Sequence, residues 1–292
     1  MKKIIFIGGC SRSGTTLIEM HFSRYLNILG LGEIKNLAQR GYFEDDKCGC
    51  GDYFSECKFW SQRFDNTNFN WEKFRDLSLY FNSLNGYFLY IFPIFRTNYW
   101  NANFKVYLAL VKEIYNNLSK NSEIFFDSSK NPIYFLYLRE ALKDFSMYYL
   151  DVIRSPFGVV NSWSSIKVRD EARLKGKMKR YDSFSASILW SIYVIASHLV
   201  SSKQTMRSKI IYESFCDEPS DIPESLIKFI GTSKSKHGYH GVSGNPSRLS
   251  FEKKHSYSID KSFQKKNLLW KISVFFLTLP GNIVRKLFFK NG

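Results

Sequence analysis

Residues 2–22 hold the feature that restricts the fold of this chain more than any other. An apolar run, "IIFIGG", leads into the polar sequence "CSRSGTT", and a helical pattern of apolar residues covers 15–26. A short buried strand that ends in glycine and continues as a helix is the layout of a phosphate-binding loop. The spacing Gly9-x-x-x-x-Gly14 predicts that successive backbone N–H groups form an anion nest, which the helix dipole reinforces.

The loop lacks the lysine of nucleotide-hydrolysing loops. Their signature places Lys before Ser or Thr, and here Thr15 occupies that position. The positive charge comes instead from Arg12, inside the loop. The sequence therefore predicts a site for phosphate without the equipment for a γ-phosphate and Mg²⁺. The loop residues that we expect to hold the phosphate are Arg12, Ser13, Gly14, Thr15 and Thr16.

Strand and helix patterns alternate along the rest of the chain. After the first strand, further strands are predicted at residues 27–33, 123–130, 146–156 and 209–215. Helices are predicted at residues 71–118, 132–145, 157–165 and 184–200. This order predicts an α/β, P-loop-containing three-layer fold with a central parallel sheet of about five strands. With no linker that divides it, we expect one domain over residues 1–292, with its ligands at the carboxyl edge of the sheet.

A second pattern strengthens the first. "SRSGTTL" resembles the 5′-phosphosulfate loop of sulfotransferases that use 3′-phosphoadenosine 5′-phosphosulfate (PAPS). In "VIRSPFGVVNSW", Arg154 ends a strand and Ser162 follows eight residues later, which resembles the 3′-phosphate motif of the same family. Segments such as "GLGEIKNL", "DSSKNP" and "HGVSGNPSR" resemble its bacterial branch, to which carbohydrate and tyrosylprotein sulfotransferases are related.

The resemblance implies roles for several residues. Glu33, 21 residues after Arg12, resembles the catalytic glutamate of the tyrosylprotein enzymes, and Lys35 beside it would hold its charge or contact the sulfonate. Lys130 would contact the sulfonate or the bridging oxygen, unless it is only a solvated lysine at a helix start. Asn245 and Arg248 resemble a loop that closes over the nucleotide.

Other polar residues of these segments are weaker candidates. His240 is the next candidate for the base after Glu33. Ser128 and Ser129 fit helix caps as well as ligands, and Asp127 fits a structural role better than a catalytic one.

Three of the five cysteines, Cys48, Cys50 and Cys57, stand close together. Three thiolates fall short of the four ligands of a structural zinc, and no histidine is near them in the sequence. We therefore expect a compact loop with buried thiols. We expect no metal site in the chain and no metal requirement for activity.

The net charge of +16 favours anionic ligands. No RNA-binding signature is present, so nucleic acid is not expected as a partner. The segment 184–200 is short for a membrane span and is predicted to be a buried helix, and 268–280 is predicted to be a core helix rather than an interfacial one. We expect a cytoplasmic protein, and association with a membrane surface stays open.

The expected reaction is PAPS-dependent sulfuryl transfer to a hydroxyl or amine. The acceptor can be a glycan, lipid, peptide or small metabolite. Residues 167–180 carry seven Lys or Arg and are predicted to be a solvated helix face, or a rim for an acidic acceptor. The alternatives are a P-loop kinase of small molecules that uses ATP, and a nucleotide-binding protein without catalysis.

Overall fold

The structure is a computed structural model of the whole chain. It describes residues 2–64, 68–120, 124–166, 168–169, 172–173, 176–231, 238–244, 249 and 259–288.

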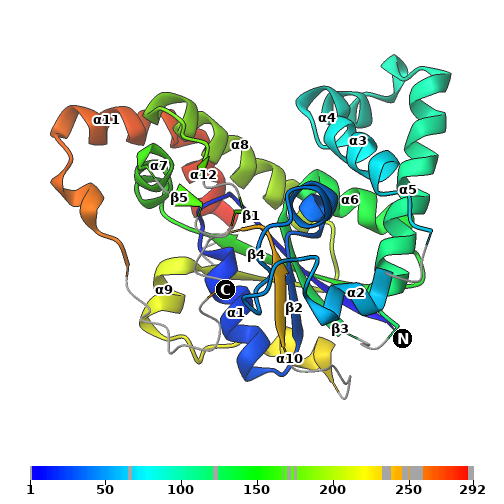
Figure 1. Cartoon of the computed structure of the whole chain (residues 1–292). Coiled ribbons are helices and arrows are strands. Elements are labelled where there is room, and N and C mark those ends of the chain that lie inside the picture. Colours follow the sequence, from blue (N-terminus) through cyan, green and yellow to red (C-terminus); the bar gives the residue numbers. More distant parts are fainter. Residues whose placement is uncertain are drawn as a thin grey trace.

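A parallel sheet forms the centre of the molecule (Figure 1). In the described part of the chain it has six strands, in the order β7-β4-β1-β3-β2-β8. Their bounds are β1 Lys3–Gly9, β2 Leu29–Gly32, β3 Ile124–Lys130, β4 Ser146–Ile153, β7 Arg207–Ile211 and β8 Tyr239–Val242. Because β1 lies between β3 and β4, the glycine loop that follows β1 is at the middle of the carboxyl edge.

The predicted fold class is confirmed, and two strand predictions are corrected. The last predicted strand, 209–215, ends at Ile211, and its remainder is helix α9 (Tyr212–Asp217). The sequence interpretation missed β8, which lies in a Gly- and Ser-rich segment that looked like a flexible loop. The four residues of β8 contain no apolar run, so the sequence gives only a weak signal for a strand. They form a strand because they pair with β2.

Helices cover both faces of the sheet and make three layers. On one face lie α1 (Thr15–Tyr25), α9 and α10 (Glu224–Ile230). The opposite face is covered by α5 (Asn98–Leu118), α6 (Pro132–Ala141) and α8 (Ser183–Ser201). Successive side chains of β1 point to opposite faces of the sheet. Ile4 and Phe6 therefore belong to one core cluster, and Ile5 and Ile7 belong to the other.

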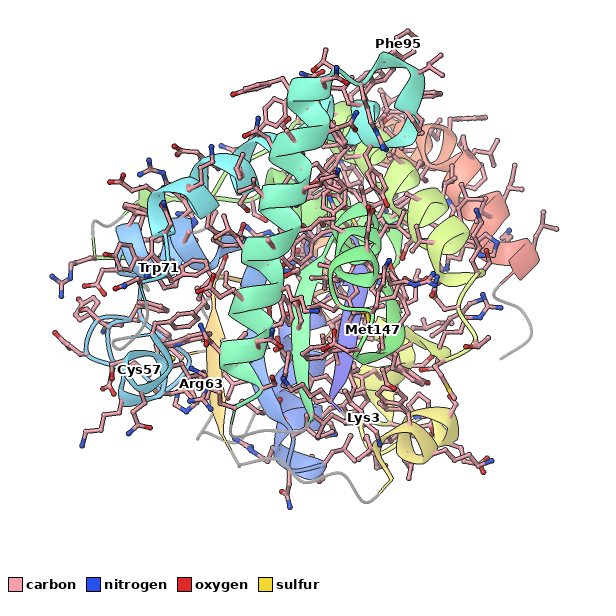
Figure 2. The ribbon with its side chains drawn as sticks, turned by 90° about the vertical axis from the view of Figure 1, so that its right-hand side faces the viewer. Lys3, Cys57, Arg63, Trp71, Phe95 and Met147 are labelled. Carbon is pink, nitrogen blue, oxygen red and sulfur yellow. The ribbon has the colours of Figure 1, made fainter. Side chains whose placement is uncertain are left out.

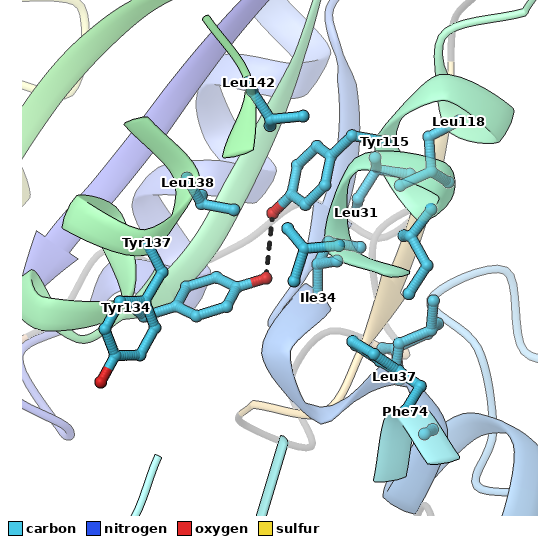
Figure 3. Close-up of a cluster of buried hydrophobic side chains, with 14 of the residues drawn as sticks. Leu31, Ile34, Leu37, Phe74, Tyr115, Leu118, Tyr134, Tyr137, Leu138 and Leu142 are labelled. Atoms are coloured by element: carbon cyan, nitrogen blue, oxygen red, sulfur yellow. Dashed lines mark hydrogen bonds between the residues drawn. The ribbon is translucent and has the colours of Figure 1, made fainter. Parts of the chain in front are cut away.

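The larger core cluster joins the sheet to the helices of the middle of the chain. Its side chains come from β2, α5 and α6, and from α3 (Trp71–Phe81) (Figure 3). Tyr115 and Tyr134 are fully buried there and share a hydrogen bond of 3.3 Å between their hydroxyls. The aromatic richness of residues 71–118 thus serves mainly to fill this core.

Two groups of helices stand at the carboxyl end of the sheet (Figure 1). One group contains α3, α4 (Leu84–Ile91) and the upper part of α5, joined by the 3-10 turn Pro93–Phe95. The other contains α7 (Pro156–Ser164), α8, α11 (Leu268–Leu277) and α12 (Leu279–Phe288). The remaining helical segments are η1 Ile34–Asn36, the π-helical turn Leu37–Phe43, α2 Lys58–Phe64 and η5 Ser262–Lys265.

The two apolar segments behave differently from each other. By length and composition α8 could cross a membrane, and α11 with α12 could do so only as one pair bent by 63°. The apolar character of α8 has a local reason, since Trp190 is buried and Ser197 Oγ donates 2.7 Å to Asp151 of the sheet.

The prediction of a buried helix at 184–200 holds for one side of α8 only, since Phe184, Ile192 and Leu199 are more than half exposed.

The prediction of a core helix at 268–280 is wrong for most of its residues. In α11 only Val274 is buried, against α7 and α8, while Leu268 and Leu269 are more than two thirds exposed. This helix packs on the outer side of α7 and α8, so only one of its sides has a neighbour.

The basic stretch is not a helix. Within 167–180 the described residues form a small antiparallel pair, β5 (Val168–Arg169) and β6 (Gly176–Lys177). Arg169 is held by ion pairs to Asp46 and Glu44, on the turn after the π-helical segment. These long-range ion pairs, which the sequence does not reveal, favour the hairpin.

Candidate functional site

The loop after β1 has the geometry of an anion nest. Arg12 and Gly14 take positive φ angles of 72° and 88°, and Gly14 is the N-cap of α1. A Cβ at Gly14 would meet the Tyr212 ring at 2.1 Å, so the ring needs glycine there. Backbone N–H groups at the start of an 11-residue helix suit an anion. Among the described residues, the buried Ser13 Oγ is one of the side-chain atoms without a hydrogen-bond partner.

Arg154 links this loop to the second predicted phosphate motif. It follows β4, and its Nη1 donates 3.0 Å to the backbone oxygen of Arg12. Its guanidinium lies 4.6 Å from the centre of the Tyr212 ring. Arg154 is buried, and within the described structure its Nε makes no hydrogen bond. Ser162, on α7, lines the same cleft as Arg154. The two motifs of the sequence thus meet in one place.

Glu33 follows β2 and is almost buried. Lys130, at the end of the neighbouring strand β3, forms an ion pair with its Oε1. Asn36 Nδ2 donates 2.8 Å to its Oε2, and Ser243 Oγ accepts from the same amide at 3.2 Å. A Cβ at Gly244 would lie 3.5 Å from Glu33 Oε1. Lys130 and Asn36 therefore hold the carboxylate, and Ser243 in turn holds Asn36.

Lys130, rather than Lys35, is the ion-pair partner of Glu33. Lys130 has a positive φ of 67°, which is rare for lysine and turns the chain at the strand end. Lys35 also lines the cleft. Burial lowers the pKa of Lys35, and the nearby Glu33 carboxylate opposes that shift. Two ammonium groups thus act on one carboxylate.

A buried carboxylate that the sequence interpretation missed supports this arrangement. Glu19, on α1, accepts 2.8 Å from the N–H of Gly32 and 2.6 Å from Ser128 Oγ. Burial raises the pKa of Glu19 to about 7, against the lowering effect of these hydrogen bonds. Glu19 thus fixes the end of β2, directly before Glu33. A glutamate at a core position of an amphipathic helix is the one signal that could have revealed it.

The structure assigns the polar residues of β3 to supporting positions. Asp127 is fully buried, accepts from Tyr115 Oη, and accepts 2.8 Å from the N–H of Ser129. Burial raises its pKa to about 6. Ser128 bonds Glu19, so neither serine caps the next helix. That cap is Asn131, whose Oδ1 accepts 2.8 Å from the N–H of Ile133.

The nest, Arg154 and Glu33 open into one cleft of about 1380 Å³. Its walls include Tyr87 from α4, Ile192 and Tyr193 from α8, and Lys179 after the β5–β6 hairpin. The residues predicted for the site that line it are Arg12, Gly14, Thr15, Thr16, Glu33, Lys130, Arg154 and Ser162. The floor of the cleft thus carries groups that suit an anion, and its walls are of mixed apolar and basic character.

Two of the predicted candidates, Ser13 and His240, do not line the cleft, and two others fall outside the described part of the chain. Ser13 is buried under the loop and does not line the cleft. Asn245 and Arg248 lie outside the described residues. His240 is on β8, away from the cleft lining, and its ring stacks on Phe59 at 4.2 Å. His240 is therefore not placed to act as a base in this cleft.

Two solved structures are similar to the chain over nearly its whole length. One is the sulfotransferase domain from the Synechococcus PCC 7002 olefin synthase, with 16% identity, a TM-score of 0.49, and coverage of 95% of this chain and 94% of that chain. The other is the sulfotransferase domain from the curacin biosynthetic pathway, with 14% identity, a TM-score of 0.46, and coverage of 99% and 98%. No protein-family model matches the chain, and no curated protein does.

Proposed function

We propose that this chain transfers a sulfuryl group from PAPS to a hydroxyl or amine of an acceptor. The observation that carries the proposal is the hydrogen bond of 3.0 Å from Arg154 Nη1 to Arg12 O. It joins two separate anion-binding motifs in one cleft, and a nucleotide with phosphates at both its 3′ and 5′ positions needs two such sites.

The unsatisfied polar groups fit that donor. The N–H groups of the nest suit the 5′-phosphosulfate, with charge from Arg12. Arg154 Nε and the Ser162 hydroxyl suit the 3′-phosphate, and Arg154 brings a planar fork of donors. A Cβ at Gly158 would meet Arg154 Nε at 2.8 Å, so the helix start of α7 leaves the room that this guanidinium needs.

The reaction follows from the Glu33–Lys130 pair. Glu33 accepts the proton of the acceptor hydroxyl as its oxygen forms a bond to sulfur. The bond from sulfur to the oxygen of the 5′-phosphate breaks in line, and 3′,5′-bisphosphoadenosine leaves with the electron pair. Lys130, which holds Glu33 before the reaction, and Arg12 neutralise the charge that grows on the sulfonate and the bridging oxygen.

A kinase reaction with ATP fits these residues less well. Thr15 stands where the lysine of such a loop belongs. Asp127, the carboxylate in the middle of β3, bonds Tyr115 and Ser129 inside the core and does not line the cleft. We expect transfer to need no metal in the cleft.

The test is a transfer assay with purified protein. PAPS is incubated with the protein and with acceptor panels of glycans, lipids, tyrosine peptides and small hydroxylated metabolites, and products are searched by mass spectrometry for the gain of one sulfonate group. We expect one panel to gain it, with equimolar release of 3′,5′-bisphosphoadenosine. Phosphorylated products formed with ATP, and none formed with PAPS, would contradict the proposal.

A further inference from the structure

Three cysteines and one histidine meet outside the cleft. The Sγ atoms of Cys48, Cys50 and Cys57 and a ring nitrogen of His240 all lie within 4.8 Å of one another. The cysteines belong to the loop before α2, and His240 is on the edge strand β8, more than 180 positions later. Figure 2 shows Cys57 on this loop beside the pale orange edge strand. The sequence interpretation missed the site because its fourth member is remote in the chain.

Four of the six distances among these ligand atoms match the edges of a zinc tetrahedron, and the other two are within 4.8 Å. Zinc with Zn–S bonds of about 2.3 Å and a Zn–N bond of about 2.0–2.1 Å requires sulfurs about 3.8 Å apart and about 3.6 Å from the nitrogen. The Cys57 sulfur is 3.6 Å from that of Cys50 and 3.7 Å from that of Cys48. His240 Nδ1 is 3.5 Å and 3.6 Å from Cys57 and Cys48. These atoms are too far apart for a disulfide, whose sulfurs are about 2.0 Å apart.

We propose that Cys48, Cys50, Cys57 and His240 Nδ1 bind one structural Zn²⁺ ion. Thiolate and imidazole ligands in a tetrahedral set select zinc among the common divalent metals. Four protein ligands leave no open position, which is the arrangement of a structural rather than a catalytic site. On binding, the thiols lose their protons to solvent and His240 binds as neutral imidazole.

The surroundings supply what such a site needs. The backbone N–H groups of Trp60 and Ser61 donate 3.0 Å and 3.1 Å to the backbone oxygen of Cys57, so the start of α2 fixes the backbone of this residue. The Phe59 ring packs between His240, 4.2 Å away, and the guanidinium of Arg63, 3.6 Å away. The His240 ring is therefore held in one orientation.

Arg63 provides a charge argument. It is only 4% exposed, and among the described residues it forms no ion pair with Asp or Glu. A buried guanidinium without an anion is unfavourable. Three thiolates and Zn²⁺ together carry one negative charge, which compensates Arg63. Figure 2 shows Arg63 next to Cys57.

The ion would fasten the cysteine loop to the strand that completes the cleft. Two residues after His240, the backbone oxygen of Val242 accepts 2.8 Å from the N–H of Glu33. Ser243, the next residue, binds Asn36, which in turn binds Glu33. The zinc site thus positions Glu33 through β8, without contacting any reactant.

Metal content tests the proposal independently of transfer activity. Protein purified without chelators is expected to contain one zinc per chain by elemental analysis and by native mass spectrometry. Cys57→Ser and His240→Ala are expected to lose most of it, and Cys216→Ser, which changes another buried free cysteine, is expected to keep it. Protein without stoichiometric zinc, iron in its place, or equal zinc in all three variants would overturn the proposal.

A second measurement avoids variants that fail to fold. Cys50 is exposed, so a free thiol there should react quickly with iodoacetamide. We expect the native full-length chain to protect it, and a strong zinc chelator to release one zinc and make Cys48, Cys50 and Cys57 reactive together. Added Co²⁺ should then give the visible spectrum of a tetrahedral thiolate site. Rapid alkylation of Cys50 before chelation, an octahedral Co²⁺ spectrum, or an intact mass two hydrogens low from a disulfide would each contradict the site.

Discussion

Lys130 forms an ion pair with Glu33 across 97 positions of the sequence, at the ends of two neighbouring strands. Both side chains are about nine-tenths buried. Lys130 therefore compensates the charge of the carboxylate that we propose as a base. Breaking such a pair leaves a buried charge without compensation, so variants at this site must separate loss of chemistry from loss of structure.

Glu33→Gln meets that requirement, because it keeps the shape and removes the basicity. We expect nucleotide binding to stay within a few-fold of wild type and turnover to fall by about two to four decades, the usual contribution of a general base. Steady-state kinetics and calorimetry measure the two effects. Glu140→Gln, on the exposed end of α6, serves as the control and should be neutral. Near-normal turnover of Glu33→Gln would refute the assignment.

Substitutions at Arg12 test whether the loop uses a positive charge in the reaction. Arg12→Ala should lower turnover strongly, because no cation then remains inside the nest. Arg12→Lys should lower it less, since the charge is kept and only the planar fork is lost. Initial rates with PAPS provide the measurement, and wild-type turnover in Arg12→Ala would show that the loop does not use this charge.

The 3′-phosphate site can be tested by binding alone. We expect 3′,5′-bisphosphoadenosine to bind roughly 10- to 100-fold tighter than the nucleotide without its 3′-phosphate, because a charge-assisted hydrogen bond contributes about 1.5–3 kcal/mol. Ser162→Ala should reduce this preference. Ser164→Ala should not, since that hydroxyl donates to Val160 of its own helix. Equal calorimetric affinities for the two nucleotides would contradict the assignment of a 3′-phosphate site.

Metal chelation distinguishes sulfuryl transfer from PAPS from phosphoryl transfer from ATP. Initial transfer rates measured within minutes of adding excess EDTA should equal those without it, because Thr15 stands where a metal-dependent loop has Lys and the charge of the loop comes from Arg12. An immediate loss that Mg²⁺ restores would favour the kinase. A slow loss that accompanies zinc release, and that Mg²⁺ does not restore, is expected from the cysteine site instead.

Glu19 predicts a pH effect on stability. Its folded pKa of about 7 exceeds that of an unfolded glutamate, so the folded state binds the proton more tightly. The stability that this tighter proton binding contributes is fully present below the pKa of the unfolded glutamate, and it is lost as pH rises through about 7. Glu19→Gln removes the titration. Between pH 5 and 8, the free energy of unfolding of the Glu19→Gln variant should therefore rise relative to that of the wild type, by roughly 3 kcal/mol. Parallel denaturation curves across this range would contradict the prediction.

The sequence was informative where chemistry is local. The nest is contiguous, and Arg154 and Ser162 are eight residues apart on one strand–helix junction, so their place at the sheet edge could be predicted. Three of the central strands, β1, β3 and β4, contain a continuous apolar run, which is a clear signal of a buried strand.

The sequence was uninformative where a role depends on a remote partner. Nothing near Glu33 indicates that Lys130 will hold it, or that Glu19 will bind the N–H of Gly32. His240 looked like a reserve base because its neighbours in the chain resemble a nucleotide loop. In the structure its neighbours are Phe59 and the cysteines, which no local pattern can show.

The edge strand β8 has a consequence for how the chain becomes active during synthesis. Val242 bonds the backbone of Glu33, and Ser243 binds Asn36, yet about 200 residues separate these partners in the order of translation. The nest and the central strands can form while the ribosome is still extending the chain. Glu33 acquires its final setting only after residues 239–244 have emerged. Under the proposed function, nascent chains would therefore bind nucleotide before they could catalyse transfer.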